Sequence, residues 1–318
     1  MLNSLTFTVA GLSLIVVFVY ILKQKGIFSS ASAPFVNSLL LNIILPANIL
    51  HELMRVPLGL HEFKTALLFN IEIVILLILT YGFGKLMKYE KPVIGAFMLS
   101  TAFAATALIG LPLIKLLYPE NARMQADAII ASEFGMIVPA FIFGPILAQI
   151  FGESGSEEDP KTLILPAIKK YLTSPIGIAL MAGLVLSWLR LPADNTVVAF
   201  TEKVLAIMSS GLSLIPLVLL GLMLEVKSVR TVLTLSAAAL VSQMMIEPYI
   251  ASFLSGALSL SNDERQVVII LSLTPSALLT PAFALKYNCA PGICSAITFV
   301  CVVSTVIFLP LGYWLLGQ

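Results

Sequence analysis

The sequence predicts an all-α protein that crosses a membrane many times, and three observations support this prediction. Of the 318 residues, 59% are hydrophobic and only 11% are charged, whereas soluble domains carry about 25% charged residues. The mean hydropathy is +1.02. The apolar residues occur in long runs, and a run of about 20 residues is the length that a helix needs to span a bilayer.

Short polar links separate these apolar runs, which predict ten spans. The runs fall at about 5–22, 35–54, 65–84, 93–117, 126–151, 173–190, 204–224, 231–256, 266–287 and 293–317. The longest link, 152–172, begins with the acidic stretch GESGSEEDP and ends in a predicted interfacial helix at about 162–172. This link divides the chain into two halves of five spans each, 1–151 and 173–318.

The lysines and arginines predict the orientation of the spans. With the N-terminus outside, the inner loops hold 11 of these residues and the outer loops hold 7, and cytoplasmic loops are the ones that carry the excess. We therefore expect a multi-pass protein of the plasma membrane, the inner membrane in a bacterium, with both termini outside. Because each half has an odd number of spans, the two halves are expected to face in opposite directions.

Two spans carry a proline at corresponding places in the two halves. Pro112 in IGLPL and Pro281 in LLTPAF are 169 residues apart. A proline inside a helix costs about 3 kcal/mol, and lipid offers no water to satisfy the freed backbone groups. Broken spans in inverted repeats are typical of secondary transporters, which bind substrate at the breaks. We therefore expect unwound segments near 109–112 and 278–281 that cross near the midplane, with two simple proline kinks as the alternative.

Polar groups near the predicted crossing are candidates for binding a substrate. The N-terminal end of a half-helix favours an anion through its dipole and its free N–H groups. Thr280 is expected to cap the half-helix that Pro281 opens, and Gly110 to end the half-helix before Pro112. Asn42 flanks Pro46, and the alternative to substrate binding by Asn42 is a structural role. The predicted substrate-binding residues are Thr106, Gly110, Pro112, Thr274, Ser276, Thr280, Pro281 and Asn42.

Three glutamates lie within predicted spans, where a charge costs at least about 2.5 kcal/mol. Glu133 and Glu247 are predicted to bind a coupling ion, either a proton or sodium, and a neutral, hydrogen-bonded structural carboxyl is the equal alternative for each. For Glu72 the structural role is favoured, because this residue lies nearer to a predicted helix end.

Several functions are not supported by any motif. The stretch GFGKLMK at 82–88 lacks the Ser or Thr and the upstream glycine of a phosphate-binding loop. The chain contains neither HExxH nor GxSxG, so we expect no enzyme activity. The spacing of Cys289, Cys294 and Cys301 matches no zinc or redox motif. We therefore expect no metal and no cofactor, and the absence of a basic patch with interleaved aromatic residues argues against nucleic acid.

Four stretches, in this order and spacing, resemble the auxin efflux carrier family, which joins plant auxin carriers to bacterial relatives proposed to carry malonate, malate and similar acids. They are NIILPANIL (42–50), FAATALIGLPL (103–113), LSLIPLVLLGLML (212–224) and STVIFLPLGYWLL (304–316). The resemblance covers essentially the whole chain and implies two inverted five-helix repeats. It also implies a scaffold domain from the first, second and fifth helices of each repeat and a transport domain with crossed fourth and ninth helices. The chain departs from the pattern at Ala105, where many relatives have asparagine.

Together these observations predict a secondary transporter that moves a small organic anion by alternating access. The expected substrate is a carboxylate such as malonate, malate or an auxin-like acid, and a proton or sodium ion is the expected coupling partner. Two alternatives stay open: a sodium-coupled bile-acid-type symporter of the same fold, and a membrane sensor that keeps the fold without transport. The sequence leaves open the exact solute, the direction of transport and whether the protein is a monomer or a homodimer.

Overall fold

The computed structural model describes residues 2–54, 63–153, 166, 169, 172–189, 195–224 and 229–316. In the first half of the chain the helices are α1 (Leu2–Gln24), η1 (Ser30–Ser32), α2 (Ala33–Leu39), η2 (Leu40–Ile44), α3 (Leu45–Leu53), α4 (Phe63–Leu86), α5 (Lys91–Ala102), η3 (Thr106–Gly110), α6 (Leu111–Leu117), α7 (Ala122–Ser132), η4 (Glu133–Ile137) and α8 (Val138–Phe151). In the second half they are α10 (Pro175–Leu189), α11 (Thr196–Ser209), η5 (Ser210–Ser213), α12 (Ile215–Met223), α13 (Val229–Val241), η6 (Ser242–Ile246), α14 (Glu247–Ala257), α15 (Asn262–Ser272), α16 (Thr280–Lys286) and α17 (Pro291–Leu316).

Helices occupy all ten segments that the sequence predicts, so the all-α membrane fold is confirmed. Within the residues that the structure describes, five helical stretches are each long and apolar enough to cross a membrane: Ser30–His51, Phe63–Leu86, Arg123–Phe151, Thr196–Met223 and Arg230–Ala257. Apart from residues 152, 153, 166, 169 and 172, the link predicted at 152–172, with its interfacial helix, lies outside the described residues.

Prolines inside the spans follow short π-helices. The π-helices η2, η3, η4 and η6 each end directly before an α-helix whose second residue is proline: Pro46, Pro112, Pro139 and Pro248, respectively. Proline has no N–H to donate, and its ring clashes with the carbonyl four residues earlier. A π-turn shifts the hydrogen-bonded carbonyl by one residue and so relieves this clash. These four helices therefore continue through their prolines instead of breaking.

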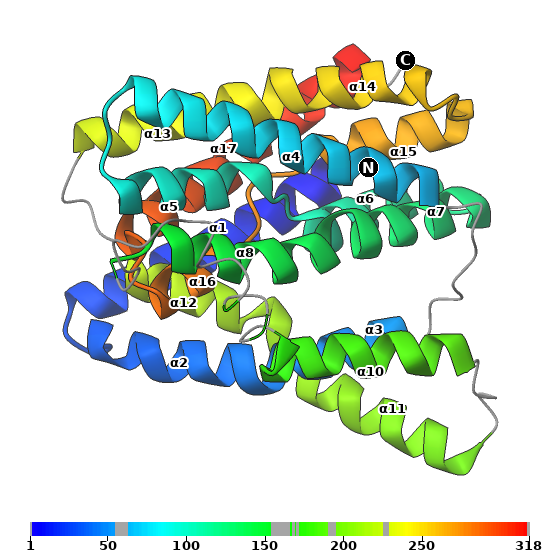
Figure 1. The fold of residues 1–318 in the computed structure, drawn as a ribbon, viewed down its shortest axis with the longest axis horizontal. Helices are drawn as coiled ribbons and strands as arrows, with labels where there is room; N and C mark the ends of the chain where they lie inside the picture. Colours follow the sequence, from blue (N-terminus) through cyan, green and yellow to red (C-terminus); the bar gives the residue numbers. More distant parts are fainter. Residues whose placement is uncertain are drawn as a thin grey trace.

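The helices form two groups (Figure 1). At the bottom of the view, α2, α3, α10 and α11 form a layer in which α10 and α11 both pack on α3. The larger group contains α4 to α8 and α13 to α17, and α17 packs on α5, α13 and α16. Helix α12 contacts α1, α2, α16 and α17, so it connects the layer to the larger group.

The fifth and tenth spans differ from the expected scaffold grouping. The fifth span, α7 to α8, packs on α4, α5 and α6, and the tenth, α17, packs on α5, α13 and α16. Both spans therefore pack mainly with the larger group, although α8 also touches α10 and α17 touches α1 and α12. At Gly135 the fifth span approaches α4 closely, since a Cβ there would lie 2.9 Å from Phe69 Cβ of α4.

Two spans are interrupted, and the interruptions cross. Helix α5 ends at Ala102 and η3 begins at Thr106, while residues 273–279 separate α15 from α16. The two non-helical segments lie side by side and antiparallel, with Ala104 opposite Ser276.

Two backbone hydrogen bonds join the crossing segments. The Ala105 N–H donates to the Pro275 carbonyl at 2.6 Å, and the Ala277 N–H donates to the Phe103 carbonyl at 2.8 Å. Each segment thus satisfies backbone groups that the other exposes, which is how irregular backbone is tolerated inside a membrane protein. The two interrupted segments therefore meet and pair with each other, while their place in two inverted repeats stays a prediction.

The breaks lie N-terminal to their predicted positions. Residues 109–112 are helical, because the π-turn of η3 accommodates Pro112 and the chain is interrupted only at 103–105. The second break, 273–279, ends before Thr280, so Pro281 lies inside the first turn of α16. The prediction that Gly110 ends a half-helix is also wrong, because η3 continues through it into α6.

Close packing against α15 requires a glycine at position 110. A Cβ at this position would lie 2.4 Å from Leu271 Cδ2 and 3.2 Å from Thr274 Cγ2. The missing side chain thus lets η3 approach the end of α15 closely, immediately beside the crossing.

Candidate functional site

A small cavity lies at the crossing, between the two groups of helices. Its volume is about 60 Å³, enough for a few water molecules, whereas pockets that enclose small organic ligands measure about 300–1,000 Å³. The lining residues are Leu45, Asn48, Ala104, Ala105, Ala107, Met136, Ile137, Ala140, Phe141, Leu212, Ala277, Leu278, Leu279, Thr280 and Phe283. In this conformation the protein is therefore closed around the crossing.

Asn48 provides a polar side chain in this lining. It lies on α3, so it belongs to the layer that faces the crossing. Its carboxamide is half-buried and, within the described part of the chain, has no hydrogen-bond partner. A carboxamide offers two N–H donors and one acceptor, so Asn48 is suited to bind a ligand in the cavity.

Asn42, which the sequence proposed for the site, lies elsewhere. It is exposed, and its Nδ2 donates to the Ser38 carbonyl at 2.9 Å and lies 3.0 Å from Ser38 Oγ. Asn42 and Asn48 are six residues apart, so helical periodicity places them on different faces of their span. Helical phase was therefore the signal that could have selected Asn48.

Two of the predicted hydroxyl ligands are buried at the crossing but bonded to other side chains. Thr106 Oγ1 lies 2.8 Å from Ser132 Oγ of α7, and Ser276 Oγ lies 3.2 Å from Thr298 Oγ1 of α17. Both pairs connect the crossing segments to neighbouring helices. These hydroxyls thus hold the crossing in place and do not line the cavity.

The other two hydroxyls are bonded to backbone. Thr274 Oγ1 donates to the Leu271 carbonyl at 2.7 Å, and Thr280 Oγ1 donates to the Ala277 carbonyl at 2.9 Å. Thr280 lines the cavity, but it is the first residue of α16 and the N-cap residue is Leu279. The prediction that the Thr280 side chain caps this half-helix is therefore wrong.

The N-terminal ends of the two half-helices differ in their free amides. At α16 the Thr280 N–H donates to the Ala277 carbonyl at 3.3 Å, the Ala282 N–H donates to the Leu279 carbonyl at 3.0 Å, and Pro281 has no N–H. The amides at this end are therefore largely used within the protein.

At η3 the end is open. Its N-cap residue is Ala105, which has no side chain that can cap, and no backbone carbonyl among the described residues accepts from the amides of Thr106 and Ala107. Ala107 lines the cavity. Because η3 continues into α6, these amides begin a half-helix that runs from Thr106 to Leu117. Unpaired amides and the positive end of a helix dipole together favour an anion.

A hollow of about 230 Å³ adjoins the crossing cavity. Phe283 lines both spaces, and Lys286 lines the hollow. The Phe283 ring lies edge-on to that of Phe141, with 6.3 Å between the ring centroids. A Cβ on Gly144 would lie 2.8 Å from Phe283 Cδ2, so the ring is closely packed on α8 as well. Phe283 thus separates the crossing cavity from a hollow that carries a positive charge.

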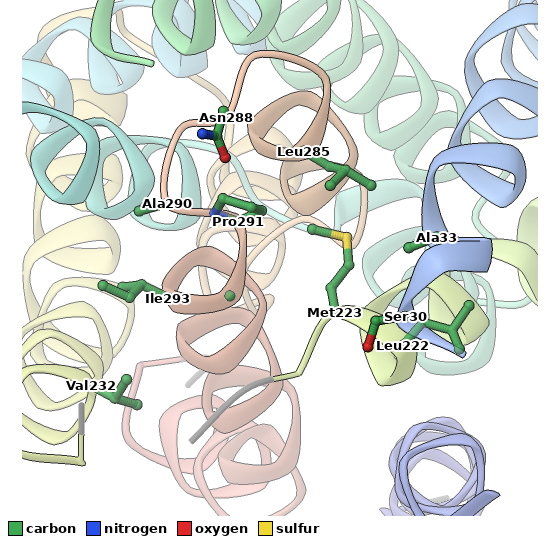
Figure 2. Close-up of a pocket in the computed structure, with 11 residues that line it drawn as sticks. Ser30, Ala33, Leu222, Met223, Val232, Leu285, Asn288, Ala290, Pro291 and Ile293 are labelled. Atoms are coloured by element: carbon green, nitrogen blue, oxygen red, sulfur yellow. The ribbon is translucent and has the colours of Figure 1, made fainter. Parts of the chain in front are cut away.

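A larger hollow, of about 410 Å³, lies between the start of α2, the end of α12 and the turn from α16 to α17. Figure 2 shows Met223 projecting into it, with Pro291 and Ile293 on one side and Ala33 on the other. This hollow and the one beside Phe283 both border α16, whose last residue is Lys286. Both lie between the layer and the larger group.

Comparison with known proteins agrees with this architecture. Residues 4–313 match the family described as membrane transport protein. The chain belongs to this family, the auxin efflux carrier family of membrane transporters. It is also similar to an uncharacterized transporter of Methanocaldococcus jannaschii, with 23% identity over 304 residues that cover 93% of this chain and 94% of the relative.

Two predicted coupling residues of this membrane transport protein lie in its larger group of helices. Glu133 is buried at the start of η4, which packs on α4, and it interacts with other groups of the protein. Glu247 is buried at the start of α14, where it accepts a hydrogen bond from Ser242 Oγ at 3.2 Å. The charge of Glu72, which the sequence assigned to structure, acts on Glu247.

Proposed function

We propose that this membrane transport protein is a secondary transporter that carries a small organic anion by alternating access. The observation that carries the proposal is the open end of η3, where the amides of Thr106 and Ala107 begin a half-helix at the cavity. In this proposal the carboxylate of malonate, malate or an auxin-like acid accepts hydrogen bonds from these amides. The carboxamide of Asn48 donates from the opposite wall.

The lining of the cavity argues for moderate affinity. It contains no lysine or arginine among its described residues, so binding rests on amide donors and a helix dipole. A hydrogen bond to a charged group contributes about 1.5–3 kcal/mol net. The Lys286 charge in the adjoining hollow attracts anions toward the crossing without binding them there.

The arrangement of the helices supports alternating access. A cavity of about 60 Å³ does not hold an organic acid, so the larger group must move relative to the layer to admit one. Phe283 is proposed to act as a gate, because it separates the cavity from the hollow that Lys286 lines. We further propose ten spans in two inverted repeats, 1–151 and 173–318, with both termini outside the plasma membrane.

A charge placed at the open helix end tests the substrate class. Ala107→Asp puts a carboxylate where the anion is proposed to bind, whereas Ala107→Asn places a neutral group of the same shape there. Like charges in contact cost several kcal/mol, so we expect Ala107→Asp to lose anion affinity by about a hundredfold or more, and Ala107→Asn to lose less than about tenfold. The measurement is thermal stabilisation of the purified variants by a panel of mono- and dicarboxylates.

Uptake into proteoliposomes tests the transport step. We expect the parent protein to move the anion that stabilises it best, and Ala107→Asp to move it poorly. Binding without uptake would support the sensor instead, and an absolute sodium requirement would support the bile-acid-type symporter. If Ala107→Asp binds its best anion as tightly as Ala107→Asn does, the anion does not bind at the η3 end.

A further inference from the structure

Two buried carboxyl groups lie on neighbouring helices in the larger group. Glu72 is on α4 and Glu247 is the first residue of α14, and these two helices pack on each other. Glu72 is 1% exposed and Glu247 is 3% exposed. Both residues are therefore almost inaccessible to solvent, and the charge of Glu72 acts on Glu247.

The hydrogen bonds of this pair are incomplete. Both carboxyl oxygens of Glu72 are buried without a hydrogen-bond partner, and Glu247 Oε1 accepts one bond, from Ser242 Oγ at 3.2 Å. The Gln243 Nε2 donor, one turn before Glu247, is also buried and unpartnered.

The local backbone places Glu247 for this contact. Ser242 begins the π-helix η6 and Glu247 directly follows it, so the π-turn brings the Ser242 hydroxyl to the Glu247 carboxyl five residues later. Pro248 follows Glu247 and is accommodated by the same turn. π-turns inside helices occur frequently at functional sites.

Among the described residues, no cation is hydrogen-bonded to the pair. The side-chain bond of Glu247 comes from the Ser242 hydroxyl, and the oxygens of Glu72 have no partner. Glu133 of η4 and Asp127 of α7, which pack on α4, have interactions of their own. The remaining charged residues on the surrounding helices lie near helix ends: Lys64 and Lys85 on α4, Lys91 on α5, Arg123 on α7, Arg230 on α13, and Asp263, Glu264 and Arg265 on α15.

We propose that Glu72 and Glu247 together bind a single proton. Two ionised carboxylates in contact inside a membrane are unfavourable, because each loses its hydration and repels the other. One proton removes the repulsion, since the protonated carboxyl donates its O–H to the ionised one. The remaining charge accepts from Ser242 and, after a small side-chain rotation, from the Gln243 amide. The two groups then titrate as one unit.

The ligands argue for a proton over a metal cation. The pair offers carboxyl oxygens and one hydroxyl, while the unpartnered group of Gln243 is an N–H donor, which repels a cation. No third His, Cys, Asp or Glu joins the pair to form a metal-binding group within the described residues. A proton needs only the two carboxyl groups that are present.

Reaction with dicyclohexylcarbodiimide tests the proposal without any transport measurement. This reagent modifies protonated carboxyl groups in apolar surroundings and leaves ionised ones unmodified. In the purified parent protein at neutral pH, we expect the first adduct to be shared between the peptides that contain Glu72 and Glu247, and to form at about the mean of the rates measured in the two single Gln variants. Glu72→Gln and Glu247→Gln each retain one site, the double variant has none, and Glu133→Gln keeps the parent's adduct at the pair.

Several outcomes would overturn the proposal. A rate of first-adduct formation in the parent equal to the sum of the rates in Glu72→Gln and Glu247→Gln would show that each carboxyl holds its own proton, and no adduct would show that both are ionised. Protection of the pair by sodium at constant pH would show that a cation binds there instead. The absence of an adduct and the sodium experiment need no variant, so they test the proposal even if a substitution prevents folding.

The role of this proton in coupling rests on the proposed transport function. If the pair carries the coupling proton, the double variant Glu72→Gln/Glu247→Gln loses the pH dependence of anion accumulation in proteoliposomes. Its anion affinity should stay within about threefold of the parent's, because the pair and the crossing cavity share no residues. Unchanged pH dependence in the double variant would overturn the coupling role. Failure of the parent protein to bind any of the anions would count against the proposed function alone.

Discussion

Two helices that lie beside each other begin in opposite ways. Helix α15 begins with a capping box, in which the Ser261 N–H donates to Glu264 Oε2 at 2.7 Å and the Glu264 N–H donates to Ser261 Oγ at 3.3 Å. Its neighbour η3 begins at Ala105 with no side-chain cap at all. Caps satisfy amides that a helix cannot satisfy itself.

The difference between these ends is the reverse of what stability alone predicts. The α15 end belongs to a loop, where water could satisfy its amides, and yet it is capped. The η3 end is at a buried crossing, where unpaired amides cost most, and it is uncapped. We infer that the amides of Thr106 and Ala107 are left open for a ligand, and the following predictions test this contrast in order of expected effect.

Gly110→Ala should have the largest effect, because it disturbs the contact between η3 and α15. Its Cβ would lie 2.4 Å from Leu271 Cδ2, and such overpacking typically costs about 1–3 kcal/mol. We expect a lower midpoint of thermal unfolding in detergent. The double variant Gly110→Ala/Leu271→Ala removes the clash. Its decrease in unfolding temperature should therefore be smaller than the sum of the decreases in the two single variants. Strict additivity would mean that the two residues do not collide.

Ala105→Asn should alter the open end directly. The carboxamide oxygen at this N-cap position accepts from the amides that are now free, as other N-cap side chains do. We therefore expect the best-bound carboxylate to bind about tenfold more weakly, which corresponds to about 1.4 kcal/mol. The matched control is Leu279→Asn at the N-cap of α16, where the neighbouring amides are already bonded. Calorimetric titration compares the two variants, and an equal loss of affinity in both would contradict the contrast between the ends.

Much of the fold follows from the sequence, because long apolar runs and corresponding prolines have few structural solutions in a membrane. The position of the breaks does not follow. Pro112 and Pro281 look equivalent in sequence, but a π-turn accommodates the first, while the second lies in the first turn of α16, after the non-helical segment 273–279. Proline alone does not decide between these outcomes, because Pro216 follows the 3-10 helix η5 and not a π-turn.

The candidate site was predicted less well, for a related reason. Thr106, Thr274, Ser276 and Thr280 are all near the crossing, as residue spacing predicts, but their hydroxyls are bonded within the protein. Only tertiary structure reveals which polar groups are already used. The same holds for Glu72 and Glu247, which the packing of α4 on α14 brings to neighbouring helices although they are far apart in the sequence.

Thr280→Val should have a modest effect on stability and little effect on binding. It removes the hydrogen bond from Thr280 Oγ1 to the Ala277 carbonyl at 2.9 Å, and a typical intramolecular hydrogen bond contributes about 0.5–1.5 kcal/mol. The hydroxyl already has this acceptor, so we expect anion affinity within about threefold of the parent's. Thermal unfolding and ligand stabilisation measure both effects. A tenfold loss of affinity would show that the hydroxyl turns toward the anion.

Glu264→Gln should have the smallest effect, because it changes only the charge of the capped end. Burial raises the pKa of Glu264, but hydrogen bonds with Ser261 and the charges of Lys64 and Arg123 outweigh it and lower the pKa below its usual value.

A lowered pKa means that the ionised carboxyl stabilises the fold at every pH above the usual glutamate pKa of about 4.3. This stabilisation is lost as the pH falls through the lower pKa of the folded state. We expect Glu264→Gln to unfold more easily than the parent at neutral pH, by about 0.3–1 kcal/mol, and the difference to vanish in acid. The control is Glu90→Gln, since Glu90 precedes α5 without making a capping bond. A pH-independent difference would show that the Glu264 charge does not stabilise the start of α15, and the contrast with η3 would then rest on the Ser261 hydroxyl alone.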